Sequence, residues 1–395
     1  MNGFICLICT ALAIPLTAAD WPYFRGTNRD GISPETGWFR PDAKLQEHWR
    51  VQVGLGFSGA SVVSNRLYTA GYANKKDSIR CLNANTGTTN WTVELPSSKG
   101  ALFYQGGTSA TPTIANGRAY HFTRSGILIA LDAPSGKILW QTNLVEHLKY
   151  DKPTWGFASS PVVLGDRVIL NAGESATAFS AADGKLIWRS GRDNAGYSTP
   201  VPFALAGAPH VALLSLKELV AVAAKDGSVA WRQRFKAGWG QAATDAVIDG
   251  KKLFISGHSA KGKQFNLLTG EEIAGFKSGI KTHFNAGVLL RNHLFVFSGK
   301  AHSKRSTLEC MSWASGESTW SHTGLGAGAL TVADGKLIIL SEDGRLLIAE
   351  AHSEEFKPLF EQQLLPDPVW TPPTLAHGKI YARSGKGDLV CISFP

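Results

Sequence analysis

The sequence predicts an all-β protein, an eight-bladed β-propeller made of four-stranded antiparallel blades. Three observations support this prediction. A Gly and a Trp recur together along the chain, a second strand–turn–strand phrase precedes each pair, and the final unit is one strand short. The repeats follow one another at roughly 40–50 residues, a period that is typical of propeller blades and other repeat folds.

Residues 127–140, ILIALDAPSGKILW, show the first phrase in full. A strand of small and apolar residues leads into a turn at residues 133–136, and a second strand returns and ends at Trp140. Pro and Gly favour this turn because Pro fixes φ and Gly tolerates positive φ. The same spacing recurs at Gly87 and Trp91, Gly184 and Trp188, Gly227 and Trp231, and Gly316 and Trp320, whereas Gly270 is followed by Ala274 in place of Trp.

A second phrase, made of a short strand, a Gly turn and another short strand, precedes each of these turns. Residues 158–171, ASSPVVLGDRVILN, are one copy, and such short apolar or alternating runs around a turn are typical of hairpins. Two hairpins per unit make a four-stranded sheet. Eight first strands can be placed, and they begin near Ser61, Ala110, Ser160, Thr199, Thr244, Ala286, Ala329 and Pro372.

The last unit, residues 371–395, ends after its third strand. Residues 45–54, LQEHWRVQVG, carry Trp49 at the place that the missing strand should fill. We therefore expect this N-terminal strand to close the ring, because closure leaves no unpaired edge between the first and last blades. Seven blades are the alternative, if residues 350–365 form a loop and not a strand pair.

The chain divides into a predicted signal peptide at residues 1–19, an N-terminal extension at 20–48 and the propeller at 49–395. The apolar run at residues 4–16 is too short to span a membrane, and small residues suited to cleavage follow it. We expect an exported protein, periplasmic or extracellular, without a transmembrane segment after cleavage. The extension, with Trp21, Phe24 and Arg25, could cover one face of the ring or simply pack against it.

Composition and motifs exclude several classes of function. The formal net charge is +9, but Lys and Arg are scattered and no aromatic–basic motif occurs, so we expect no nucleic-acid partner. Cys81, Cys310 and Cys391 take a repeat position that Ala holds in other blades, which favours buried thiols over a disulfide. The histidines lack metal-ligand spacing, and no nucleophile or phosphate-loop motif occurs, so no catalytic residue and no metal site are predicted.

The phrase IALDAPSGKILW at residues 129–140, with its altered copies AFSAADGKLIW and CLNANTGTTNW, resembles the pyrroloquinoline quinone (PQQ)-like β-propeller repeat family. That family includes quinoprotein alcohol dehydrogenases, which use PQQ and calcium, and the lipoprotein subunit of the outer-membrane barrel-assembly machinery, which is a scaffold. The resemblance implies an exported binding or scaffold module. The alternatives are a PQQ-dependent oxidoreductase or quinone-binding protein, and a scaffold in outer-membrane protein assembly.

The sequence departs from the dehydrogenases of this family. It has neither their adjacent cysteine pair nor a C-x-x-C-H haem motif. We therefore expect no cofactor, with PQQ and calcium as the alternative, and we leave open whether the protein is an enzyme.

In a propeller, the loops that enter the innermost strands surround the mouth of the central channel. Aromatic and amide side chains recur in these loops, and they could stack a flat or sugar-like ligand or anchor a partner's loop. Wedging between blades is the alternative role for the aromatic rings. The expected occupant is an unknown small molecule or an envelope protein, and the chain is expected to be a monomer. The candidates are Phe57, Tyr104, Gln105, Trp155, Phe157, Tyr197, Trp239, Gln241, His283, Asn285 and Trp370.

Overall fold

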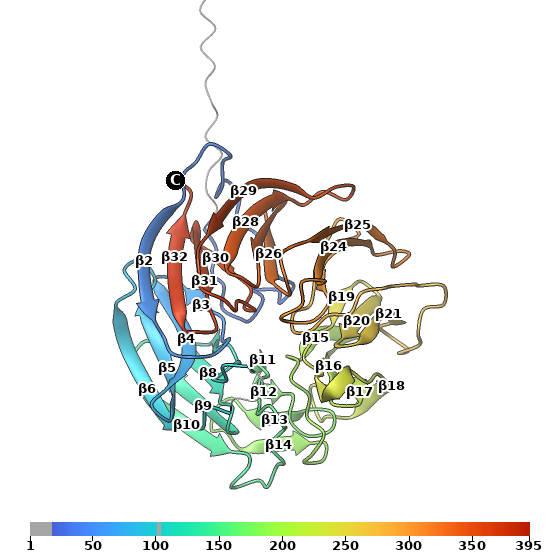
Figure 1. The fold of residues 1–395 in the computed structure, drawn as a ribbon. Helices are drawn as coiled ribbons and strands as arrows, with labels where there is room; N and C mark the ends of the chain where they lie inside the picture. The colour runs from blue at the N-terminus through green and yellow to red at the C-terminus, as the bar shows by residue number, and fades with distance from the viewer. Residues whose placement is uncertain (1–17, 101–103) are drawn as a thin grey trace, which may run out of the picture.

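A computed structural model describes residues 18–100 and 104–395. In this part of the chain, eight β-sheets stand around a central axis like the blades of a propeller (Figure 1). The first four blades are β3 (Ser61–Val63), β4 (Arg66–Ala73), β5 (Lys76–Asn83) and β6 (Thr89–Pro96); β7 (Thr113–Ala115), β8 (Arg118–Phe122), β9 (Ile127–Asp132) and β10 (Ile138–Asn143); β11 (Val162–Leu164), β12 (Arg167–Leu170), β13 (Thr177–Ser180) and β14 (Leu186–Arg189); and β15 (Val201–Leu205), β16 (Ala208–Leu214), β17 (Glu218–Ala223) and β18 (Val229–Arg234).

The second half of the ring continues the pattern with one exception. The fifth blade has three strands, and a single bridge between Phe265 and Glu272 stands in place of its fourth. The remaining strands are β19 (Val247–Asp249), β20 (Lys252–Gly257) and β21 (Ala260–Asn266); β22 (Val288–Leu290), β23 (His293–Ser298), β24 (Thr307–Ser312) and β25 (Ser318–Thr323); β26 (Ala329–Ala333), β27 (Lys336–Leu340), β28 (Arg345–Glu350) and β29 (Lys357–Gln363); and β30 (Thr374–Ala376), β31 (Lys379–Arg383) and β32 (Asp388–Ser393).

The ring closes as the sequence predicts. Strand β2 (Gln46–Gln52) pairs antiparallel with β32 and completes the eighth blade, with Trp49 opposite Cys391. Residues 357–363 form strand β29, so the prediction of eight blades is confirmed and the seven-bladed alternative is wrong. The predicted signal peptide falls almost wholly on residues outside the described part of the chain.

A tryptophan at the end of six of the eight blades joins its blade to the next. Trp140 donates its indole N–H to the Ala181 carbonyl at 3.1 Å, and its ring covers Gly184, whose φ is +72°. A Cβ on Gly184 would overlap with that ring. Five more indoles make the equivalent bond: Trp49 to Ala84 (3.0 Å), Trp91 to Ala133 (3.0 Å), Trp188 to Ala224 (3.1 Å), Trp231 to Leu267 (2.9 Å) and Trp320 to His352 (2.9 Å).

The three described cysteines confirm the register of the repeat. All three are free and buried. Cys81 lies opposite Trp91 and Cys310 opposite Trp320, the place that Ala130 takes opposite Trp140. The prediction that cysteine replaces alanine as a small buried residue is therefore confirmed.

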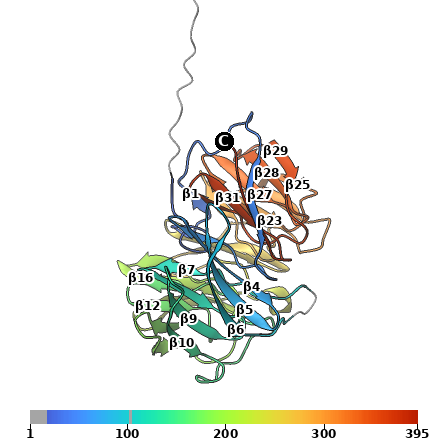
Figure 2. The ribbon, with the colours of Figure 1, turned by 90° about the vertical axis from the view of Figure 1, so that its left-hand side faces the viewer.

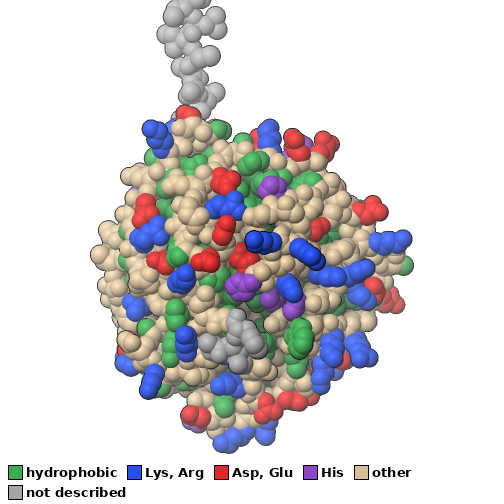
Figure 3. Space-filling view, in the orientation of Figure 1, with side chains coloured by type: hydrophobic (Ala, Val, Ile, Leu, Met, Phe, Trp, Pro, Cys, Tyr) green, Lys and Arg blue, Asp and Glu red, His purple; other side chains and the backbone are tan. Residues whose placement is uncertain are grey.

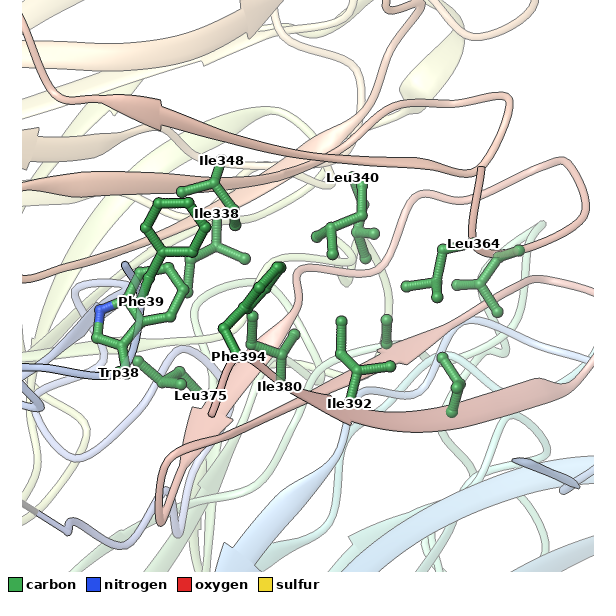
Figure 4. Packing of buried hydrophobic residues seen from close by; sticks show 14 of the residues in the cluster. Trp38, Phe39, Ile338, Leu340, Ile348, Leu364, Leu375, Ile380, Ile392 and Phe394 are labelled. Carbon is green, nitrogen blue, oxygen red and sulfur yellow. The ribbon is translucent and has the colours of Figure 1, made fainter. Parts of the chain in front are cut away.

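Where the repeat lacks its tryptophan, other residues fill the junction. Beside Gly316 the backbone of Lys277 and the ring of Phe276 take the place that Ala274 leaves open. Between blades seven and eight, the ring centroid of Phe39 lies 4.9 Å from that of Phe394 (Figure 4). The ring centroid of Phe360 also lies 4.9 Å from that of Phe394. Aromatic contact area thus stabilises these two junctions without the indole hydrogen bond.

The N-terminal extension crosses the face of the ring that lies opposite the loops entering the first strands. Its strand β1 (Ile32–Ser33) pairs with β26 and lies at one face of the ring in the side view (Figure 2). Trp21 exchanges two backbone hydrogen bonds with Val62 of the first blade. The buried Glu35 carboxylate accepts the Gly378 amide of blade eight at 2.8 Å. These contacts join the extension to blades one, seven and eight.

Among the described residues, no helix has the length and apolar character to cross a membrane. The helical element among these residues is the single turn η1 (Gly238–Gly240).

The contact between Trp140 and Gly184 can be separated from backbone strain by comparing two glycines. Gly207 also has a positive φ, +79°, but an added Cβ there meets nothing within 4 Å. Gly184→Ala should lower the free energy of unfolding by about 1–3 kcal/mol more than Gly207→Ala, because only the former displaces an indole. Urea denaturation of both variants measures the difference, and equal losses would contradict the interlocking role of the indole.

Candidate functional site

A cavity of about 520 Å³ occupies the mouth of the central channel, on the face opposite β1. Residues from seven blades and the extension line it, most of them aromatic or small. The lining consists of Phe24, Phe57, Tyr104, Ser109, Trp155, Ala158, Ser160, Tyr197, Thr199, Trp239, Gln241, Ala243, Asp245, His283, Phe284, Asn285, Ala301, His302, Trp370 and Pro372. In the space-filling view, histidine side chains gather near the middle of the face on view (Figure 3).

Nine of the eleven predicted site residues lie in this lining. Phe157 instead packs between blades, with its ring centroid 4.7 Å from that of Phe122. The prediction that Phe157 lies at the channel mouth is therefore wrong, because its ring belongs to the core. Gln105 also lies outside the lining. The neighbouring Gly156 has a φ of +76°, which breaks the alternation that would otherwise send Trp155 and Phe157 to the same side.

Eleven lining residues were not among the predicted ones. Several, such as Ser109, Ala158 and Ala243, take the repeat position of Phe57, so counting from the first strand of each blade would have found them. Phe24 comes from the extension, and no feature of its sequence context points to the channel.

Aromatic rings form a continuous arc along one side of the cavity. Phe57 stacks on Trp370 with ring centroids 4.6 Å apart, and Tyr104 follows at 6.1 Å from Phe57. Trp155 extends the arc, at 6.2 Å from Tyr104, and Phe284 extends it the other way, at 4.6 Å from Trp370. Spacings of 4.5–7 Å are those of favourable aromatic contacts, so the arc is a preformed stacking surface.

A ladder of hydrogen bonds between neighbouring blades forms the floor of the cavity. The Thr111 amide donates to the Ser160 hydroxyl at 2.9 Å, and the Ser160 amide donates to the Thr199 hydroxyl at 3.2 Å. The Thr199 amide then donates to Asp245 Oδ1 at 2.6 Å. Asp245 in blade five therefore takes the repeat position that the hydroxyl residues Thr111, Ser160 and Thr199 hold in blades two to four.

Asp245 is a buried carboxylate, 6% exposed. Burial raises its pKa to about 6, against the opposing effects of the Arg25 charge and the Thr199 amide. Arg25 is itself buried, and its Nη2 donates to the backbone carbonyls of Gly287 (2.8 Å) and Asp30 (2.9 Å). Desolvation thus outweighs the nearby cation at this carboxylate.

Both ring nitrogens of His283 make hydrogen bonds. Its Nδ1 accepts the Ala301 amide at 2.9 Å, so its Nε2 carries the proton and donates to Gln241 Oε1 at 2.8 Å. Burial, with His258, His302 and Lys300 nearby, lowers the pKa of His283 to about 3. Since both ring nitrogens are engaged, His283 is a positioning group for Gln241, and the described residues contain no cluster of His, Cys, Asp or Glu suited to a metal ion.

Glu342 orders the rim beside the arc. Its Oε1 accepts the Trp370 indole N–H at 2.9 Å and the His302 amide at 2.8 Å, and its Oε2 accepts the Ala327 amide at 3.0 Å. The Trp370 ring is therefore fixed in orientation by a hydrogen bond as well as by stacking.

Trp239 differs from every other aromatic residue of the lining. Its side chain is 87% exposed, and its φ of 55° places a bulky residue in the left-handed region. Both features are unfavourable for a residue without a function, because the backbone is strained and the ring gains no burial. An exposed Trp at the rim of an aromatic cavity is suited to covering a ligand or anchoring a partner.

A family model described as outer membrane protein assembly factor BamB matches residues 75–322, well over half of the chain. The chain belongs to this family. The BamB family match confirms the resemblance to PQQ-like repeats that the sequence shows. A search of curated proteins found no match.

Solved structures of this fold include a BamB and two dehydrogenases. BamB from Moraxella catarrhalis has 17% identity and a TM-score of 0.64, over 89% of this chain and 100% of that one. A europium-containing methanol dehydrogenase has 12% identity and a TM-score of 0.73, over 95% and 98%. A quinohemoprotein alcohol dehydrogenase from Pseudomonas putida HK5 has 13% identity and a TM-score of 0.70, over 95% and 80%. At such identities the likeness concerns the fold.

The cavity lining does not fit PQQ and calcium. PQQ carries three carboxylates, which call for Arg or Lys, and the residues that line the cavity include neither. Calcium requires several converging oxygen ligands, whereas the lining offers one carboxylate, Asp245. A trianionic quinone would also meet that carboxylate in a buried setting.

The strain at Trp239 predicts an unusual order of stability between two truncations. Gly tolerates a φ of 55°, whereas Ala at this φ retains the steric cost of about 1 kcal/mol. Trp239→Gly should therefore be more stable to urea than Trp239→Ala by about that amount. The reverse order would mean that the turn relaxes to negative φ once the indole is removed.

His283 predicts a pH dependence with a defined sign. Because its folded pKa of about 3 lies below the value of about 6.5 for free histidine, the unfolded chain binds more protons between these pH values. Its stabilising contribution is complete above pH 6.5 and is lost as the pH falls. When the pH is lowered from 6.5 to 5, the free energy of unfolding of His283→Gln should therefore fall by about 1–2 kcal/mol less than that of the wild type.

The control for this measurement is His147→Gln, a substitution of an exposed histidine. Urea denaturation of the three proteins at each pH cancels the contributions of acids that they share. A His283→Gln variant that loses as much stability as the wild type would show that the ring is protonated in the folded state.

Proposed function

We propose that the protein is an exported binding module that holds a ligand in the aromatic cavity at its channel mouth. The observation that carries the proposal is the convergence of nine predicted loop side chains, from seven blades, on one cavity. Its volume, about 520 Å³, lies in the range of small-molecule sites, and apolar walls with a few polar groups are typical of them.

Binding without catalysis is the function that this lining supports best. Among the lining groups, the His283 nitrogens are both engaged by neighbours, and the Ser160 and Thr199 hydroxyl oxygens each accept a backbone amide. None of these arrangements pairs a nucleophile with a base. The lining instead offers shape, stacking and a polar floor.

Family membership favours a second candidate, a scaffold in outer-membrane protein assembly. In this case the mouth would receive a loop of an envelope protein, with Trp239 as the anchor, since an exposed Trp beside a pocket is the typical centre of a protein interface. The two candidates share the site and differ in the size of the occupant.

A titration with the neutral fluorescent probe N-phenyl-1-naphthylamine tests the proposal. Saturable enhancement of its fluorescence is expected, and it should be lost in a Trp155→Ala, Trp239→Ala, Trp370→Ala triple variant, because these rings form the walls. The single variant Trp239→Ala, which removes an exposed ring, should weaken binding several-fold without unfolding the protein.

The matched control is a double variant, Ile138→Ala and Leu139→Ala, which removes exposed apolar side chains on β10, outside the cavity. It should bind the probe like the wild type. Undiminished binding by a folded triple variant would place the probe elsewhere and overturn the proposal.

A further inference from the structure

The floor of the cavity carries a charge that the repeat does not require. The residues at the place of Asp245 in the three preceding blades are Thr111, Ser160 and Thr199, whose hydroxyls complete the same hydrogen-bond ladder. A hydroxyl would serve the ladder equally well, because its oxygen accepts the same amide. The carboxylate therefore adds a negative charge at the floor that the hydrogen-bond ladder does not need.

Asp245 lacks a close cation. Its reported hydrogen bond joins Oδ1 to the Thr199 amide, and none of the ion pairs within 4.0 Å among the described residues includes it. Arg25 acts on it electrostatically from the extension, but the guanidinium is held by the Gly287 and Asp30 carbonyls and does not line the cavity. A buried carboxylate in this position is stabilised by any cation that enters from the cavity side.

The walls of the cavity also favour a positively charged ligand. The faces of Trp, Tyr and Phe rings attract cations electrostatically, most strongly Trp. Tyr104, Trp155 and Trp370 belong to the arc, and Trp239 stands at the rim. Lys and Arg do not occur in the lining, and His283 is neutral. Arg124, which donates to the Tyr104 hydroxyl at 2.8 Å, lies outside the lining.

We propose that the cavity takes an organic cation: an ammonium or guanidinium group that reaches Asp245, on an apolar or flat body that lies against the aromatic arc. The inference rests on the proposed function, because it names the chemistry of the ligand held at that site. The cation could be a free amine or the basic side chain of a partner protein, which share this chemistry.

Three ligands with the same phenyl body and different charge test the proposal: 2-phenylethylamine, 2-phenylethanol and phenylacetate. Calorimetric titration of the wild type at pH 7.5 should show the amine binding at least about 10-fold more tightly than the alcohol, with the acid weakest. Equal affinity for amine and alcohol would overturn the cation proposal and leave apolar binding intact. Failure of all three, and of N-phenyl-1-naphthylamine, would overturn the proposed function itself.

Asp245→Asn keeps an acceptor for the Thr199 amide and removes the charge. The affinity for 2-phenylethylamine should fall about 30-fold or more, the lower range for removing one member of a desolvated charge pair, while that for 2-phenylethanol stays the same. The matched control is Asp249→Asn, an exposed position in the same blade with the same change of charge. An unchanged amine affinity in folded Asp245→Asn would overturn the proposal; if this variant does not fold, the ligand series on the wild type decides.

The pH dependence gives an independent readout. Amine affinity should fall as the pH drops through about 6, where Asp245 takes up a proton, and Asp245→Asn should lack this fall. His302 and His283 also line the cavity and Arg25 lies behind its floor, so any fall that remains in Asp245→Asn measures their share. An identical pH profile in the two proteins would contradict a contact between the amine and this carboxylate.

Two blocked peptides distinguish the sources of the cation. Acetyl-Gly-Arg-Gly-amide and its citrulline counterpart have the same shape and differ in charge. If the arginine peptide binds, the citrulline peptide does not, and Asp245→Asn abolishes the binding, the occupant is a basic side chain of a partner. Binding of 2-phenylethylamine with neither peptide would identify a small free amine.

Discussion

The contact between an indole ring and the turn of the next blade fixes the geometry of this protein. Each such tryptophan donates to a carbonyl of the neighbouring blade, and in five of the six cases its ring lies on a glycine whose φ is positive. The two partners occupy fixed places in the repeat, so one contact sets the spacing and the tilt at every junction where it occurs. The inner strands then meet closely enough for the Ser and Thr ladder to form. The cavity depends on this alignment, because its walls come from loops of seven blades.

The fold could be predicted from the sequence because its signals are repeated and local. Gly184 and Trp140 mark the same contact from two blades, and the missing strand of the last unit pointed to residues 45–54. The fifth blade shows the limit of this reasoning. Ala274 marked the loss of the indole, but the repeat pattern gave no sign that the blade lacks a regular fourth strand or that Phe276 and Lys277 lie beside Gly316.

The site could be predicted only in part, for reasons that differ between residues. Aromatic residues before first strands lie where the topology puts them, so Phe57, Trp155 and Trp370 were found. Phe157 was misplaced because a positive φ at Gly156 turns the chain between neighbouring aromatics. The electrostatics of Asp245 follow from burial and from the charge of Arg25, a residue far away in the sequence, and the two effects combine only in the folded ring.

The floor of the cavity belongs in part to a segment that lies outside the repeats. Phe24 lines the cavity, and the next residue, Arg25, sets part of the field at Asp245, yet both come from the extension that crosses the opposite face. The ring supplies walls that its own symmetry constrains, since a change at one blade must respect its neighbours. The extension is free of that constraint. Substitutions in a short stretch of the N-terminal extension can therefore change the depth and polarity of the cavity while the sequence of the propeller stays the same.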